Sequence, residues 1–81
     1  MVTLERKPTV LRSFGISKST LHNLINTGLF PAPIQIGSRS VAWPSNEVET
    51  LINAKIAGKS LDEIRLLVKV LVKKRKEAGV A

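Results

Sequence analysis

The segment from Gly15 to Trp43 constrains the fold of this 81-residue chain most strongly, because its glycines and prolines permit only short elements. Ser17 can act as the N-cap of a helix over residues 18–27, its hydroxyl accepting an otherwise unpaired backbone N–H. Gly28 stands where a residue in the left-handed conformation commonly ends a helix. The pattern therefore predicts one short helix.

The residues after this helix predict a β-hairpin. Pro31 and Pro33 prevent further helix and favour an extended path. Residues 34–36 and 41–43 alternate in polarity as short strands do, and a four-residue loop, residues 37–40, joins them. Because a lone hairpin is marginally stable in water, we expect apolar residues of both strands to anchor it on the helices. These residues are Ile34, Ile36, Val41 and Trp43, of which Trp43 is expected in the core.

A helix is predicted on each side of this segment. The first covers residues 8–14, with Pro8 in its first turn, where the missing N–H costs nothing, and it follows a loose arm of residues 1–7. The other begins after Ser45, which is expected to be its N-cap, and ends at Gly58. Its expected buried stripe consists of Val48, Leu51, Ile52 and Ile56.

A last helix is predicted from a capping box. Ser60 and Glu63 have the spacing at which each side chain bonds the other's backbone N–H, and the helix should continue to about residue 78. One wide face is apolar, with Leu61, Ile64, Leu67, Val68, Leu71 and Val72. Leu66 and Val70 lie on nearly the opposite side, and a helix that is apolar almost all round needs partners on two sides. We expect it to pack on its own domain and, through Leu66, Val70 and their neighbours, on a second copy; a helix that only closes the core is the alternative.

The charge of the chain indicates a polyanionic partner. Thirteen basic and six acidic residues give a net charge of +7 and a pI of about 10.4. That balance favours nucleic acid first and an anionic membrane surface second. No apolar run approaches the length of a membrane span, and the N-terminus lacks the apolar stretch of a signal peptide, so we expect a cytoplasmic protein without a membrane partner.

The chain offers little for catalysis or metal binding. It has no cysteine, which excludes disulfides, thiolate zinc sites and cysteine nucleophiles, and its one histidine, His22, has no second histidine to bind a metal with, which argues against a metal site. We find neither a nucleophile with its base nor a phosphate-binding loop. We therefore expect no catalytic residues, no metal and no cofactor.

The polar residues of the predicted helix over residues 18–27 gather on one side of a helical wheel. They are Lys18, Ser19, His22, Asn23 and Asn26. Asn can pair bidentately with adenine and Lys can reach guanine, so this face suits the major groove of DNA. A merely solvated face is the alternative, but it would usually mix acids with bases. From Arg6 to Pro44 there is no acidic residue and there are five basic ones.

A single arginine, Arg39, stands at the tip of the predicted hairpin among small residues, so its guanidinium can extend from the body of the protein. In a wing beside a groove-bound helix, such an arginine meets phosphates or enters the minor groove. Ser38 and Ser40 are auxiliary candidates for phosphate contact, and Arg12 is a further basic candidate from the acid-free span. A solvated turn residue is the alternative for Arg39.

The order of these landmarks resembles the pattern of the AlpA-type prophage regulators. The resemblance rests on the runs GISKSTL from residue 15, GLFPAP from residue 28, Ile36-Gly37 and VAW from residue 41. It implies a small winged helix-turn-helix protein related to phage excisionases and to the DNA-binding domains of the MerR group. It places Lys18, Ser19, Thr20 and His22 at recognition-helix positions and Arg39 in the wing. His22 stands where tyrosine is common in the family.

We therefore expect a mainly α fold with a small β-hairpin, a winged helix-turn-helix with an additional C-terminal helix. Residues 1–58 should form the DNA-binding domain, and residues 59–81 the last helix, as a dimerisation element with a basic tail. The family pattern does not explain this last helix. Its basic turn, residues 73–76, either complements the helix dipole or touches flanking phosphates.

The function favoured by the sequence is specific binding of double-stranded DNA by a transcription regulator of a prophage or mobile element. An excisionase, a recombination directionality factor that bends attachment-site DNA to assist an integrase, is the alternative. A second alternative is a protein-interaction module, such as an antitoxin or anti-regulator, that uses its apolar tail on a partner. Only the first two predict DNA binding that weakens steeply with salt.

Overall fold

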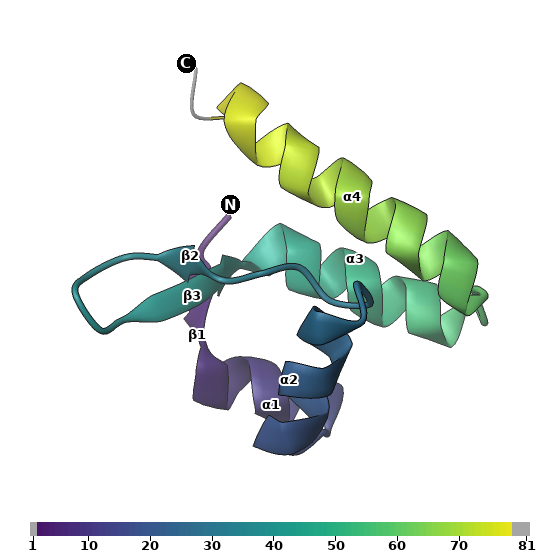
Figure 1. Ribbon diagram of the computed structural model, residues 1–81, viewed down its shortest axis with the longest axis horizontal. Coiled ribbons are helices and arrows are strands. Elements are labelled where there is room, and N and C mark those ends of the chain that lie inside the picture. The colour runs from purple at the N-terminus through teal and green to yellow at the C-terminus, as the bar shows by residue number, and fades with distance from the viewer. Residues whose placement is uncertain (1, 79–81) are drawn as a thin grey trace.

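The computed structural model describes residues 2–78, which form four helices and a three-stranded antiparallel sheet (Figure 1). The elements are β1 (Leu4–Arg6), α1 (Lys7–Phe14), α2 (Lys18–Asn26), β2 (Ile34–Gln35), β3 (Val41–Pro44), α3 (Ser45–Ile56) and α4 (Leu61–Ala78). The strand order is β1-β3-β2. This confirms the expected mainly α, winged-helix-like fold. Met1 of the expected arm and residues 79–81 of the expected tail lie outside the described residues.

The helices end at the residues that the sequence indicated. Gly15 and Gly28 adopt left-handed φ values of 67° and 79°, which a side chain would strain. Ser17 caps α2 by accepting a backbone N–H at 3.2 Å. At the start of α4, the Ser60 N–H donates to the Glu63 carboxylate at 3.0 Å, and the Glu63 N–H donates to the Ser60 hydroxyl at 3.2 Å. The capping box is therefore confirmed.

The N-terminal arm, which we expected to be loose, forms β1 and pairs antiparallel with β3. Thr3 extends this pairing to the start of α3. The Ser45 N–H donates to the Thr3 carbonyl at 2.7 Å, and the Ser45 hydroxyl accepts the Thr3 N–H at 2.8 Å. The prediction of Ser45 as N-cap is wrong, because its hydroxyl is engaged by the arm and Pro44 occupies the cap position.

Trp43 joins the hairpin to the helices. It is fully buried, and its indole Nε1–H donates to the Pro31 carbonyl at 2.8 Å, so its polar atom is satisfied. Phe30 packs edge-on against it with ring centroids 5.8 Å apart, and Phe14 packs edge-on against Phe30 at 5.2 Å. The core is otherwise aliphatic, built from Val10, Leu21, Val48, Leu51, Ala54, Ile64, Val68 and Leu71. The prediction that Trp43 lies in the core is confirmed.

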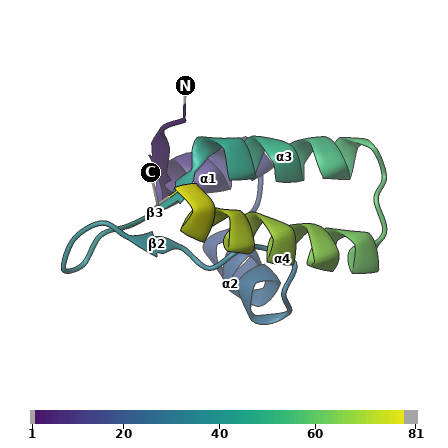
Figure 2. The same cartoon turned by 90° about the horizontal axis from the view of Figure 1, so that it is seen from above.

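The buried face of α3 differs from the expected one. Ile56 is 79% exposed and Ile52 is only partly buried, whereas Ala54 and Glu47 are buried with the predicted Val48 and Leu51. The cause is α4, which lies alongside α3 in both views (Figures 1 and 2). It covers the side of α3 that carries Glu47 and leaves the opposite side, with Ile56, in solvent.

The hairpin is tighter at its tip than the sequence predicted. The Ile36 N–H donates to the Ser40 carbonyl at 2.9 Å, which leaves residues 37–39 as a three-residue tip. Ile36 is 43% exposed and does not anchor the hairpin, because the tip projects beyond the helices (Figure 1). Trp43 anchors it, together with Val41, which packs against the core.

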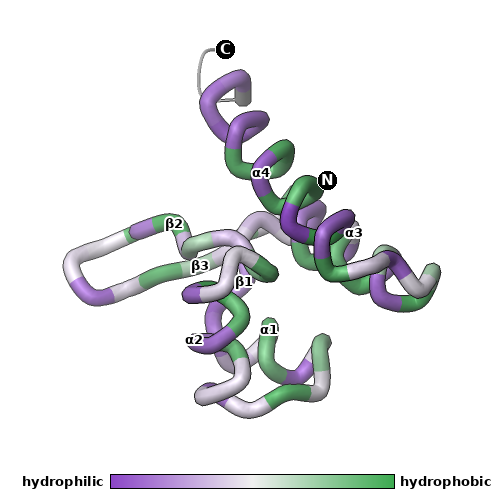
Figure 3. Tube along the Cα trace, turned by 45° about the vertical axis from the view of Figure 1, so that its right-hand side comes forward, coloured by the Kyte–Doolittle hydropathy of each residue, from purple (hydrophilic) through white to green (hydrophobic). Residues whose placement is uncertain are grey.

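The last helix closes the core with one narrow stripe. Ile64, Val68 and Leu71 are buried, while two residues of the expected wide face, Leu61 and Val72, remain exposed. Leu66 and Val70, on the other side, are 63% and 48% exposed. Apolar and polar residues alternate along α4 in the hydropathy view (Figure 3). The helix therefore leaves apolar side chains in solvent after it has packed.

Candidate nucleic-acid interface

The outward face of α2 is exposed and unengaged. Leu21 is fully buried, and Leu24 and Ile25 are partly buried, so these residues hold the apolar side of α2 against the core. The polar residues of the opposite side, Lys18, Ser19, His22, Asn23 and Asn26, are all exposed. Within residues 2–78, no hydrogen bond or ion pair ties these five side chains to the rest of the protein. Their donors and acceptors are therefore available to a partner.

Thr20, which the family resemblance placed among the recognition positions, lies at the border of this face. It is exposed, but its hydroxyl forms a 2.9 Å hydrogen bond with the Ser17 hydroxyl, and its N–H is the one that Ser17 caps. It also borders an apolar hollow of about 350 Å³ between α1, α2 and α3, with Phe14 and Leu24. Thr20 therefore takes part in the start of α2 as well as its surface.

The C-terminal end of α2 is held from α4, a contact that the sequence did not reveal. The Arg65 Nε–H donates to the Thr27 carbonyl at 3.1 Å across 38 positions of sequence. The Thr27 hydroxyl in turn donates to the Asn23 carbonyl at 2.8 Å. No local spacing signals such a contact, because it depends on how α4 crosses the end of α2. One hydrogen bond thus links the last helix to the C-terminal end of the helix that carries the exposed polar face.

The wing carries Arg39 at an exposed tip. Ser38 is exposed and Ser40 is half-buried. The Gln35 side-chain amide donates to the Ser38 carbonyl at 3.4 Å and braces the turn from β2. Figures 1 and 2 both show the loop extending away from the helices. Nothing in the body of the protein therefore limits access to Arg39.

The candidate residues form separate patches. The hairpin carries Arg39 away from α2, so the wing tip and the polar face of α2 are apart (Figure 1). Arg12 is exposed in the last turn of α1, which directly precedes α2 in the chain. A partner that touched all three would have to be extended, as a DNA duplex is.

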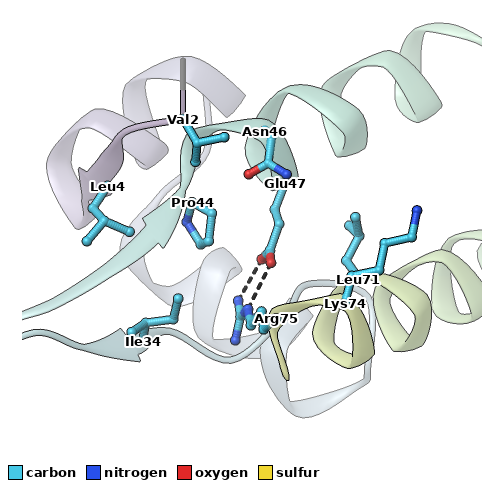
Figure 4. A pocket seen from close by; sticks show the side chains of 9 residues that line it. All are labelled: Val2, Leu4, Ile34, Pro44, Asn46, Glu47, Leu71, Lys74 and Arg75. Carbon is cyan, nitrogen blue, oxygen red and sulfur yellow. Dashed lines mark hydrogen bonds and ion pairs between the residues drawn. The ribbon is translucent and has the colours of Figure 1, made fainter. Parts of the chain in front are cut away.

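The ion pairs of the described residues all lie in α3, α4 and their connection. They are Lys59–Glu63, Arg65–Asp62 and Arg75–Glu47. The last is bidentate, at 2.6 and 2.8 Å, and largely buried, with side chains 18% and 4% exposed (Figure 4). Arg75 therefore belongs to the internal structure rather than to an exposed basic turn.

The residues that the structure describes meet neither the requirements of a metal site nor those of a membrane-spanning helix. Over residues 2–78, no three histidine, aspartate or glutamate side chains are grouped so that they could hold a metal ion. None of the helices described is both long and apolar enough to cross a membrane.

A helix-turn-helix followed by a projecting β-hairpin, whose sheet is completed by the N-terminal strand, defines the winged-helix class. Within it, the chain belongs to the family described as prophage CP4-57 regulatory protein (AlpA), whose model matches residues 4–56. The family is one of regulatory proteins, and the match confirms the resemblance noted from the sequence. It ends before α4.

A relative comes from Enterobacteria phage P4. The uncharacterized protein ORF88 of that phage is 39% identical over 54 residues, which cover 67% of this chain and 61% of the relative. The chain thus spans about three fifths of that relative's length. No solved structure matches the chain.

Proposed function

We propose that this protein binds double-stranded DNA sequence-specifically and regulates transcription of a prophage or other mobile element. In this proposal α2 enters the major groove, and the β2–β3 hairpin lies along the neighbouring backbone. The observation that carries it is the unengaged polar face of α2, set in a stretch from Arg6 to Pro44 with five basic residues and no acidic one. Membership of a prophage regulatory family supports the regulatory role.

The N-terminal end of α2 is the end that approaches the bases. Helix-turn-helix proteins usually direct this end of the recognition helix into the groove, which brings Lys18, Ser19 and His22 deepest. The first turn of α2 contains no acidic residue, so the partial positive charge of the helix N-terminus remains available to phosphates. Asn23 and Asn26 follow on the same face with amides suited to adenine.

The wing contributes affinity rather than sequence selectivity. Arg39 is the charged residue of an otherwise small, polar tip, and its guanidinium matches phosphate oxygens or a narrow minor groove. Ser38 and Ser40 supply hydroxyls beside it. Contacts of this kind fix orientation on the duplex without reading bases directly.

Selection of bound duplexes from a random pool, followed by a salt titration on the selected site, tests the proposal. We expect a defined motif to be enriched, and its affinity to fall roughly a hundredfold between about 50 and about 200 mM salt if about four phosphates are neutralised. If no motif is enriched and random duplexes show no salt-dependent binding, the result would contradict DNA recognition and favour the protein-interaction module.

Footprinting then separates the two DNA-based roles. Protection of a promoter, with a change in transcription, supports the regulator. Protection confined to an attachment site, with stimulation of excision by an integrase, would contradict the transcriptional role and identify an excisionase. The two duplexes should be compared at equal salt, because the electrostatic part of the affinity is common to both.

A further inference from the structure

The exposed side of α4 carries a stripe with the spacing of a coiled-coil seam. Its members, at alternating steps of three and four residues, are Glu63, Leu66, Val70, Lys73 and Glu77. All five are exposed, with Leu66 and Val70 at 63% and 48%. At about 100° per residue they fall on the side of α4 opposite Ile64, Val68 and Leu71, which face the core. We refer to these five residues as the outer stripe.

We infer that the outer stripe pairs with the outer stripe of a second copy, with the two α4 helices antiparallel. The stripe has apolar residues at its centre and charged residues toward both ends. In an antiparallel seam, each position meets the one equally far from the centre on the other helix. Leu66 of one chain then packs on Val70 of the other, and Glu63 of one chain meets Lys73 of the other.

The same register makes the ends complementary. Glu77 near the end of one α4 meets Lys59, just before the start of the other, and Lys59 is exposed beside Glu63. A parallel pair would instead set Glu63 on Glu63 and Lys73 on Lys73, and such like-charge contacts are unfavourable. Charge complementarity therefore selects the antiparallel arrangement with the Leu66–Val70 centre. The charged pairs specify the register, while the two apolar residues supply the contact area.

The inference does not depend on DNA binding, since it concerns the protein alone. Two apolar residues per chain form a small contact, so we expect a weak dimer. Its dissociation constant should lie between about 10 µM and about 1 mM. Sedimentation velocity over that range tests it. The wild-type protein should show a concentration-dependent shift from monomer to dimer, and a monomer throughout would overturn the inference.

Two substitutions of exposed aliphatic residues locate the contact. Leu66→Ser should weaken association on the order of tenfold or more, because Leu66 is at the centre of the stripe. Ile56→Ser is the matched control, since Ile56 is 79% exposed but lies on α3, away from the outer stripe. Equal effects of the two substitutions would contradict the assigned surface.

A charge-reversal pair tests the register. Lys73→Glu and Glu63→Lys should each be monomeric alone, because each places like charges opposite one another in its own homodimer. Mixed together, the two variants should associate at least as well as the wild type, since every Glu then meets a Lys. Circular dichroism checks that Glu63→Lys, which also removes half of the capping box, remains folded. A folded pair that does not associate on mixing would overturn the register.

Discussion

Residues 6–44 and residues 45–77 use their charges in opposite ways. The first stretch has five basic residues and no acid, and no ion pair forms within it. The second has eight basic and five acidic residues and contains all three ion pairs of the described chain. Six charged residues of the second stretch therefore pair with one another within the protein, whereas the five basic residues of the first stretch have no acidic partner there. This difference is the basis on which we propose that the first stretch contacts DNA.

The largest expected effect concerns stability and comes from the second stretch. Arg75→Ala leaves the Glu47 carboxylate, 4% exposed, without its bidentate partner. Removing one member of a buried pair is strongly destabilising, so we expect the free energy of unfolding in urea to fall by about 3 kcal/mol. Lys76→Ala, at the exposed next position, is the control and should change it by less than about 0.5 kcal/mol. Similar losses in both variants would show that Arg75 is no more structural than its neighbours.

The next effect concerns DNA affinity and comes from the first stretch. Lys18→Ala or Asn23→Ala should weaken binding to the selected site by about 1–3 kcal/mol if these residues contact bases, with little change for random duplexes. The chain offers matched controls on α3, because Lys55 and Asn53 are also exposed and are of the same residue types. Fluorescence anisotropy would measure all four variants. If Lys55→Ala and Asn53→Ala weaken DNA binding as much as the two α2 variants do, the assignment of base contacts to the first stretch is wrong.

A smaller and less selective effect is expected at the wing. Arg39→Ala should lower affinity for most sequences by about 1 kcal/mol and reduce the slope of log affinity against log salt by about 1. Lys55→Ala removes the same charge from an exposed position on α3, away from the wing, so its salt slope should stay near that of the parent. If Lys18, Asn23 and Arg39 variants all bind as the parent does in a gel shift, the assignment of α2 to the groove is wrong.

The helix-turn-helix and the candidate face could be predicted because their signals are local. Gly15, Ser17 and Gly28 set the ends of α1 and α2 by their own backbone and side-chain chemistry. The periodicity of α2 then assigned Leu21 to the core and the amides to solvent, as the structure shows. Local capping and period-3.6 patterning are enough for this part of the fold.

The missed features depend on residues far apart in the sequence. β1 forms because the N-terminal arm pairs with β3, and the Ser45 hydroxyl does not cap α3 because it accepts the N–H of Thr3, 42 positions away. Glu47 is buried because α4 brings Arg75 against it, 28 positions later. Arg65 reaches the end of α2 for the same reason. Each of these features depends on where α4 and the N-terminal arm pack on the rest of the protein. Local sequence patterns do not predict those positions.

The smallest effect is a pH dependence at the start of α4. The pKa of Glu63 lies below its ordinary value because its carboxylate accepts the Ser60 backbone N–H, with the Ser60 hydroxyl and the charge of Lys59 acting in the same direction. A carboxyl group with a lowered pKa in the folded state contributes stability above its unfolded pKa, and that contribution is lost as the pH falls through the folded value. Glu63→Gln keeps an acceptor for the N–H but does not titrate, so the difference in unfolding free energy between parent and variant should shrink on acidification. Glu49→Gln, an exposed carboxylate on α3, serves as the control in the same urea titrations. If the difference in unfolding free energy between the parent and Glu63→Gln is the same at every acidic pH, the charge of Glu63 does not stabilise the capping box. Glu63 would then contribute only a hydrogen-bond acceptor at the start of α4.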